Sequence, residues 1–476
     1  MAPALPKAAT GIRGLDEITG GGLPRGRATL ICGAAGSGKT VLATEFLVRG
    51  VELGERGVFM TFEESAEDLT SDLASLGFDL AGLVAQKKIV IDHVRVSRHE
   101  IEETGEYDLE GLFIRLDHAI KSVNAKRVVL DTIETLFAGF SNLGLLRVEL
   151  GRLFSWLKNR GVTAVITGER GQGTLTRHGL EEYVSDAVIE LDNRVNDQVS
   201  TRRLRIVKYR GSSHGTNEYP FLIGRTGLSV LPITSLALQH EAPLERISTG
   251  LEGLDAMLAG SGFYRGSSIL VSGPAGTGKS SLAAHFADAA CRRGERCVHF
   301  LFEESPSQYM RNMRSIGLHL DRWLKDGRLH FRAARPALLG LEQHLVAMYR
   351  EIEETGPAVV VVDPINNLLS AGVADAVKAT LLRLVDYLKT KHITALFTSL
   401  TGGDAHEQTT DTGVSSLMDT WILLRAFEKQ GQRHRGLYVL KSRGMPHSND
   451  VCPYRITDQG IHLARRSSGP LKRKAR

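Results

Sequence analysis

Short runs of apolar residues recur along the chain and are separated by longer amphipathic stretches. In the first half these runs lie at residues 28–32, 58–61, 127–130 and 164–167, and many of their residues are β-branched. Near-continuous apolar runs of this length, alternating with helical patterns, are typical of strands that are buried on both faces of a parallel sheet. The pattern therefore predicts an α/β fold in which a mainly parallel sheet is flanked by helices.

The second half of the chain repeats the first, because five landmarks occur twice in the same order. They are TGIRGLD at 10–16 and TGLEGLD at 249–255, GAAGSGKT at 33–40 and GPAGTGKS at 273–280, FEES at 62–65 and 302–305, VVLD ending at Asp131 and VVVD ending at Asp363, and KYRG at 208–211 and KSRG at 441–444. A repeat of roughly 230 residues is far longer than a solenoid unit, so each copy is expected to be a whole domain.

The chain is therefore expected to contain two tandem domains of the same doubly wound fold. Its 476 residues also exceed what one hydrophobic core normally supports. The expected division is residues 1–232 for the first domain, 233–247 for a linker, 248–464 for the second domain and 465–476 for a basic flexible tail.

Composition indicates an ordinary globular protein, with 42% hydrophobic and 24% charged residues. The N-terminal residues lack the apolar core of a signal peptide, and no stretch approaches the ~18 uninterrupted apolar residues of a membrane span. We therefore expect a cytoplasmic protein without a membrane partner. No metal-type CxxC pair occurs among Cys32, Cys291, Cys297 and Cys452, so these residues are expected to be reduced thiols.

Much of the net charge of +5 lies in the last dozen residues. There six cations occur without an acid: Arg465, Arg466, Lys472, Arg473, Lys474 and Arg476. Such a tail can bind nucleic acid or another anionic surface by counterion release. A solvated, frayed terminus is the alternative interpretation.

Each copy contains a complete phosphate-binding loop between an apolar strand and a helical segment. In that context glycines let backbone N–H groups turn toward phosphate oxygens, and the helix N-terminus adds a positive field. Lys39 and Lys279 are expected to reach the outer phosphates, and the hydroxyls of Thr40 and Ser280 to bind Mg²⁺. The predicted ATP-binding residues are Gly33, Ala34, Ala35, Gly36, Ser37, Gly38, Lys39 and Thr40, with Gly273, Pro274, Ala275, Gly276, Thr277, Gly278, Lys279 and Ser280 in the second copy.

Two acidic groups recur near these loops. Asp131 and Asp363 each end an apolar strand, where an acid beside the metal site of a nucleotide is expected; a helix cap is the alternative. The pairs Glu63-Glu64 and Glu303-Glu304 follow strands, and a glutamate so placed can accept a proton from water or a hydroxyl. Two adjacent like charges resist ionising together, so one of each pair is a candidate base. Solvated surface glutamates are the alternative.

Lys208 and Arg210 in the first copy match Lys441 and Arg443 in the second. Alternation along a strand puts both cations of such a pair on one face, where they suit a phosphate. They are far in sequence from the loops, so they are predicted to act on the nucleotide of a neighbouring subunit. A solvated basic strand face is the alternative.

The entry motif TGIRGLDEITGGGLPRG, the phosphate loop, FEES and the K-x-R-G motif together resemble the KaiC family of RecA-like ATPases across nearly the whole chain. The resemblance implies a double-ring homohexamer with ATP at subunit interfaces, slow hydrolysis, and serine/threonine autokinase and autophosphatase activity in the second ring. It also implies that Glu63, Glu64, Glu303 and Glu304 are catalytic, and that Lys208, Arg210, Lys441 and Arg443 act in trans.

The resemblance further points to Ser415 and Ser416 as phosphoacceptors, with Thr410 as a nearby accessory hydroxyl. The first copy has Glu182 and Tyr183 at the matching positions, and therefore no acceptor hydroxyl there. Adjacent serines in a polar loop are also common turn residues, which is the alternative.

The sequence thus predicts an ATP hydrolase and serine/threonine autokinase that acts as a signalling or clock-type regulator, with ATP and Mg²⁺ as cofactors. Its expected partners are copies of itself and regulatory proteins. A RecA-type DNA-handling motor is one alternative, although neither copy has a lysine-rich or aromatic-interleaved stretch for nucleic acid. A nucleotide-gated scaffold without kinase activity is the other.

Overall fold

The structure, a computed structural model, describes residues 5–94, 109–137, 143–171, 173–177, 179, 185–196, 199–232, 242–336, 340–372, 374–401, 414–429 and 432–464. The chain divides into two compact units, Met1–Thr234 and Ser235–Arg476, and each is described by itself. The basic tail, Thr410, Glu182 and Tyr183 lie outside the described residues.

The first unit is built on one sheet, which has nine strands within the described residues, in the order β11-β10-β9-β8-β3-β7-β6-β4-β5. Pairing is parallel from β8 through β3, β7, β6 and β4 to β5, and antiparallel along β8, β9, β10 and β11. The strands are β3 (Ala28–Gly33), β4 (Gly57–Thr61), β5 (Ile89–His93), β6 (Arg127–Asp131), β7 (Thr163–Glu169), β8 (Ala187–Asn196), β9 (Val199–Tyr209), β10 (Glu218–Gly224) and β11 (Gly227–Val230). A two-stranded ribbon joins β1 (Lys7–Ala8) to β2 (Leu23–Pro24).

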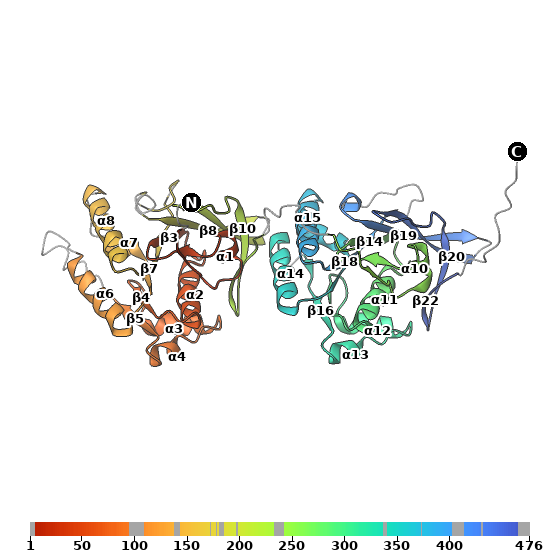
Figure 1. The fold of residues 1–476 in the computed structure, drawn as a ribbon, viewed down its shortest axis with the longest axis horizontal. Helices are drawn as coiled ribbons and strands as arrows, with labels where there is room; N and C mark the ends of the chain where they lie inside the picture. The colour runs from red at the N-terminus through yellow and green to blue at the C-terminus, as the bar shows by residue number, and fades with distance from the viewer. Residues whose placement is uncertain are drawn as a thin grey trace. The chain divides into compact units, whose positions relative to one another are not determined.

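Helices cover both faces of this sheet (Figure 1). They are α1 (Leu15–Ile18), α2 (Lys39–Glu52), α3 (Ala66–Ala74), α4 (Leu80–Ala85), α6 (Glu110–Val123), α7 (Ile133–Phe137) and α8 (Leu143–Asn159). Successive residues of one strand point to opposite faces of the sheet, and therefore pack in different hydrophobic clusters. Val129 packs in the cluster that contains α2, whereas Val128 and Leu130 pack in the cluster that contains α6 and α8.

The second unit repeats this plan, with the strand order β16-β15-β17-β18-β14-β19-β20-β21-β22 among the described residues. Its strands are β14 (Ser268–Gly273), β15 (Cys297–Leu301), β16 (Leu329–Ala333), β17 (Val359–Asp363), β18 (Thr394–Leu400), β19 (Thr420–Lys429), β20 (Gln432–Ser442), β21 (Cys452–Thr457) and β22 (Gly460–Leu463), with the ribbon β12 (Arg246–Ile247) and β13 (Phe263–Tyr264). Its helices are α10 (Glu252–Met257), α11 (Lys279–Arg292), α12 (Pro306–Arg314), α13 (Asp321–Lys325), α14 (Leu341–Thr355) and α15 (Ala374–Thr390), with 3₁₀ turns η2 (Ile365–Ala371) and η3 (Val414–Ser416).

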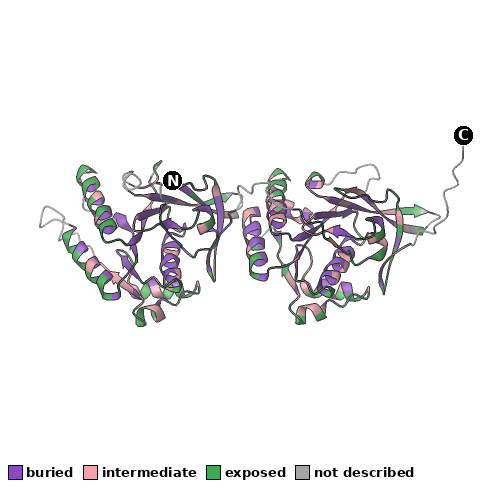
Figure 2. Cartoon of the chain, viewed as in Figure 1, coloured by how far each residue is buried: buried purple, intermediate pink, exposed green. Residues whose placement is uncertain are grey.

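The predicted α/β class with a mainly parallel sheet is confirmed in both units. The four apolar runs of the first half form β3, β4, β6 and β7, and these inner parallel strands are buried (Figure 2). The antiparallel extension of each sheet was not predicted, because strands such as β9 carry many charged residues. The four cysteines are free thiols. In the part of the chain that is described, no helix combines the length and apolarity of a membrane span.

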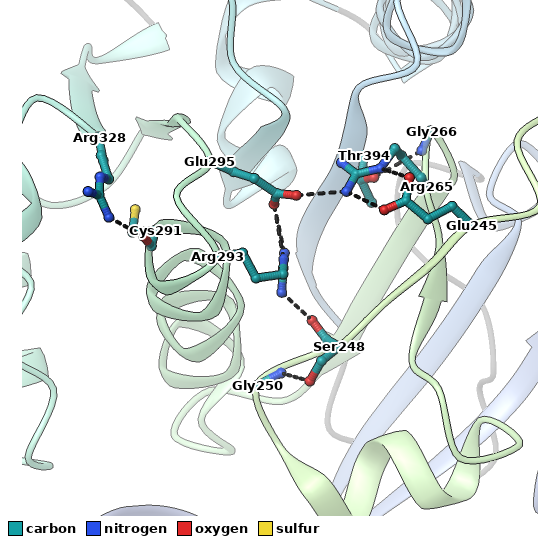
Figure 3. A network of polar contacts seen from close by, with 10 residues as sticks. All are labelled: Glu245, Ser248, Gly250, Arg265, Gly266, Cys291, Arg293, Glu295, Arg328 and Thr394. Carbon is teal, nitrogen blue, oxygen red and sulfur yellow. Dashed lines mark hydrogen bonds and ion pairs between the residues drawn. The ribbon is translucent and has the colours of Figure 1, made fainter.

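In each unit an arginine side chain hydrogen-bonds the N-terminal segment to the core, but the two arginines occupy different positions in the fold. In the first unit the buried Arg127 on β6 donates hydrogen bonds to Ala9 O and Phe46 O, both at 2.6 Å, and to Glu55 Oε2 at 2.7 Å. In the second unit Arg293, after α11, donates to Ser248 O at 2.9 Å and pairs with Glu295 at 3.0 Å (Figure 3). Arg265 also pairs with Glu295 and with Glu245, as Figure 3 shows.

Candidate nucleotide sites

The phosphate loop of the first unit joins the end of β3 to the start of α2. Gly36 and Gly38 have φ angles of 72° and 106°, in the left-handed region that glycine adopts readily. No side chain caps the N-terminus of α2, so its first N–H groups are directed into the loop. The same geometry holds in the second unit, where Gly276 and Gly278 have φ angles of 75° and 92° and α11 is likewise uncapped. Both loops therefore present the anion cradle that polyphosphates require.

Close packing also restricts one loop position to glycine. A Cβ atom on Gly38 would lie 2.7 Å from Cδ1 of Ile223, and one on Gly278 would lie 2.5 Å from Cδ1 of Ile456. Both isoleucines belong to the antiparallel part of the sheet, on β10 and β21. The antiparallel part of the sheet thus packs against the phosphate loop and fixes the path of its backbone.

The loop lysines lie at the centre of each cradle. Lys39 Nζ donates hydrogen bonds to Gly33 O at 2.9 Å and to Ala34 O at 3.1 Å. Lys279 Nζ makes the matching contacts with Gly273 O at 2.9 Å and Pro274 O at 3.0 Å. Burial lowers the pKa of Lys279, while the charges of Asp363 and Glu303 oppose that effect. The ammonium groups are therefore placed where phosphate oxygens would bind.

Asp131 and Asp363 lie beside the loops at the ends of β6 and β17. Asp131 accepts hydrogen bonds from the hydroxyls of Thr167 and Thr40, and Asp363 accepts them from Thr398 and Ser280. Burial raises the pKa of both aspartates, although these hydrogen bonds favour the ionised form.

The donor set of each site suits Mg²⁺. Hydroxyl and carboxylate oxygens are the hard ligands that this ion prefers, and it is commonly held by few side chains together with phosphates and water. Among the described residues, no group of three or more histidine, cysteine, aspartate or glutamate side chains is arranged to hold a metal ion by itself. Thr40 with Asp131, and Ser280 with Asp363, are the residues that would hold the ion beside a bound nucleotide.

The paired glutamates follow β4 and β15. They lie at the carboxyl ends of the parallel strands, the same edge of each sheet as the phosphate loop. The two pairs have different partners. Glu63 Oε1 accepts a hydrogen bond from Thr135 Oγ1 at 2.8 Å, whereas the carboxylate of Glu304 accepts from Asn312 Nδ2 at 3.1 and 3.3 Å. Burial raises the pKa of Glu64, and the charges of Asp131, Asp72, Glu63 and Asp68 raise it further.

The K-x-R cations lie at the opposite edge of each sheet, where the parallel strands begin. Lys208 and Lys441 are on β9 and β20, and each follows a register shift against β8 or β19, while Arg210 and Arg443 come just after the strands. Arg443 N donates to Asp419 O at 2.8 Å, and Asp419 N donates to Ser268 O at 2.9 Å. Ser268 is the first residue of β14, and the phosphate loop begins five residues later, so about 16 Å of strand separates the two sites.

The predicted acceptor serines lie at this same edge, in η3. Ser416 is exposed and Ser415 is half-buried. Lys441 Nζ donates to Ser415 O at 3.1 Å, and Arg443 Nη2 donates to Ser416 O at 2.8 Å. The two cations therefore bind the backbone of the serine segment within one chain, and the serines lie away from the phosphate loop of their own unit.

Sequence reasoning missed several residues of these sites. Thr167 and Thr398 support the aspartates, and their recurrence in matched strands was a signal that could have identified them. Asn312 and Thr135 have no such signal, because the first copy has Asp72 opposite Asn312 and the second has Asn367 opposite Thr135. Tyr454, whose hydroxyl donates to Thr277 O in the second loop, comes from a strand far along the chain.

Comparison with known proteins places this geometry in a wider context. The family model described as "ATPase: KaiC" matches residues 8–235 and again residues 247–468. The chain is 56% identical to the circadian clock protein KaiC2 of Synechocystis sp. over 463 residues, which cover 97% of the chain and 82% of that protein. It is 38% identical to KaiC3 of the same organism over 469 residues, covering 97% and 92%. It is 37% identical to the circadian clock oscillator protein KaiC of Synechococcus elongatus over 462 residues, covering 96% and 89%.

Proposed function

The chain belongs to the KaiC family of ATPases, and from that premise we propose that it is an ATP hydrolase whose second unit also phosphorylates its own serines. The proposed assembly is a homohexamer in the cytoplasm that signals to regulatory proteins through its phosphorylation and nucleotide state. One observation carries the proposal: Lys441 and Arg443 bind the backbone of Ser415 and Ser416 at the sheet edge opposite the phosphate loop.

In the first unit, hydrolysis is assigned to the residues gathered at the loop. Lys39 and the loop amides bind the phosphates, and the Glu63-Glu64 pair accepts the proton of the attacking water. Mg²⁺, when bound, would neutralise charge on the transferring phosphate. Thr40 and Asp131 would hold the ion at the site.

In the second unit, the proposed acceptor is a serine hydroxyl. The oxygen of Ser415 or Ser416 forms a bond to the γ-phosphorus, the bond to the β–γ bridging oxygen breaks, and ADP leaves. The hydroxyl proton passes to Glu303 of the subunit that holds the nucleotide. Lys279 and the loop amides of that subunit bind the phosphates, and Lys441 and Arg443 of the acceptor subunit stabilise charge on the transferred group.

The separation of the two edges favours transfer between subunits. A serine held at the start of β14 lies about 16 Å of strand away from the loop of its own unit, far beyond the contact distance that phosphoryl transfer needs. In a head-to-tail ring, one edge of each unit faces the opposite edge of the next, so a loop and a serine segment from neighbouring chains meet.

A mixing experiment tests this proposal. Wild-type protein incubated with Mg-ATP should gain ~80 Da on the peptide that contains Ser415 and Ser416. Lys279→Ala chains should gain nothing alone, but should become phosphorylated when mixed with Ser415→Ala/Ser416→Ala chains, which supply the intact second loop. If wild-type protein shows no mass gain, the kinase part of the proposal is wrong. Gain by wild type without gain in the mixture would contradict transfer between subunits.

A further inference from the structure

We propose that the residue eight positions after each glutamate pair, Asp72 in the first unit and Asn312 in the second, is a positioning residue that gives the two nucleotide sites different pH dependence. The inference rests on the proposed role of the glutamate pairs as proton acceptors. It concerns which group faces the second glutamate of each pair, Glu64 or Glu304.

In the second unit this group is an amide. The N-terminus of α12 is fixed directly after Glu304 by a capping box between Ser305 and Gln308, with hydrogen bonds of 3.3 and 3.2 Å. This box sets the helix register, and two turns later Asn312 donates from Nδ2 to both carboxylate oxygens of Glu304, at 3.1 and 3.3 Å. This uncharged donor fixes the direction of the carboxylate and adds no charge beside it.

In the first unit the helix register is the same and the group is different. Ser65 caps α3 and accepts from Asp68 N at 3.1 Å, as Ser305 caps α12. Asp72 therefore occupies the position of Asn312, but an ionised carboxylate has no N–H to donate. It places a negative charge where the second unit has a hydrogen-bond donor.

The surroundings of Glu64 strengthen the contrast. The charged groups that act most strongly on it are Asp131 at the end of β6, Asp72 and Asp68 on α3, and the adjacent Glu63. All four are acidic, and together with burial they raise the pKa of Glu64. In the second unit, Glu304 has Asp363 and Tyr309 nearby and also has the Asn312 amide. Asp72 therefore adds an acidic charge at the position where the second unit has an uncharged amide.

The pH profile of phosphate release tests the inference in the first unit. In a Lys279→Ala background, which disables the second loop, Asp72→Asn should move the acidic limb of turnover down by about half a pH unit, since one nearby like charge that acts through water has about that effect. Asp72→Ala should move it in the same direction, because it also removes the charge. A control is Glu67→Gln, which removes an equal charge from α3 at a residue that is not among the main charges acting on Glu64.

The reciprocal substitution tests the second unit. Asn312→Asp should move the acidic limb of serine phosphorylation upward, because it adds a negative charge beside the glutamate pair that contains the proposed base Glu303. Acidic limbs that coincide with those of the parent proteins, in variants with unchanged melting temperatures, would overturn the inference. Glu63→Gln/Glu64→Gln distinguishes a failure of the proposed function from a failure of the inference. If it leaves turnover unchanged, the glutamate pair is not the proton acceptor, and the inference is overturned with it. If it abolishes turnover while Asp72→Asn leaves the limb in place, only the inference is wrong.

Discussion

The side chain of Arg127 occupies the space that a side chain on Gly50 would need. A Cβ atom on Gly50 would lie 2.4 Å from Cδ and 2.6 Å from Nε of Arg127. The second unit has Ala290 and Val359 at the matching positions of α11 and β17. A glycine paired with a buried arginine in one copy thus corresponds to an alanine paired with a valine in the other.

This pairing predicts that Gly50→Ala lowers the free energy of unfolding of the first unit by about 1–3 kcal/mol, the usual cost of overpacking a core. Arg127→Val should cost more, because it leaves Glu55 and two backbone carbonyls without their buried donor. In the double variant the two costs should be less than additive, since valine makes room for the new methyl group.

Urea unfolding can be followed through Trp156, after Trp323 and Trp421 of the second unit are replaced by phenylalanine. Ala290→Gly is the matched control: it removes a methyl group from a helix without changing this contact in the first unit. Strict additivity of Gly50→Ala and Arg127→Val would contradict the steric explanation.

A second prediction concerns His299, which is buried on β15 where the first unit has Phe59. Its ring lies 4.8 Å from that of Tyr309 and 5.6 Å from that of Phe331, and its Nε2 is 4.0 Å from Asp363 Oδ2. Neither ring nitrogen has a hydrogen-bond partner among the described residues. Burial lowers the pKa of His299 to about 3.

The unfolded chain therefore binds a proton at this histidine below about pH 6.5, while the folded chain resists it down to about pH 3. Stability of the second unit should be lost as the pH falls through that range. At pH 5, His299→Phe should recover about 2 kcal/mol of this loss relative to wild type. Urea unfolding in a Trp156→Phe background, read through Trp323 and Trp421, measures it at pH 5 and pH 7. A gain that is equal at both pH values would mean that protonation is not the cause. Phe59→His should introduce the same loss of stability with falling pH in the first unit.

A third prediction concerns assembly. If each nucleotide is bound by the loop of one chain and the K-x-R cations of the next, ATP binds the assembled state better and stabilises it by mass action. Light scattering should show hexamers with Mg-ATP and smaller species without it. Lys39→Ala should weaken this response, because Lys39 lies at the centre of the first loop. A monomer under every condition would contradict the prediction.

The parts of the fold and the site that depend on local spacing could be predicted from the sequence. The phosphate loops are encoded by glycines and a lysine within eight residues, and the parallel strands by apolar runs. Asp131 and Asp363 could be placed at strand ends for the same reason.

The remaining features depend on contacts between distant segments. The antiparallel strands carry alternating charges, so their apolar signal is weak. The contact between Gly38 and Ile223 depends on the position of β10 in the complete sheet. The position of Lys441 and Arg443 at the edge opposite the loop follows from strand order, which no single motif contains. The contact between Glu304 and Asn312 depends on the capping box that starts α12, and the second copy alone has an asparagine there.

The opposite placement of loop and cations has a consequence for genetic dominance. In the proposed ring, a chain with Lys279→Ala would disable one second-unit site. A chain with Lys441→Ala/Arg443→Ala would also disable one, because each variant would remove one half of one site. A chain with all three substitutions would disable two sites, its own and that of its neighbour. When half of the chains are replaced at random, the single-sided variants should leave roughly half of the sites intact, and the combined variant roughly a quarter. An allele that damages both edges would therefore be more dominant than either allele alone.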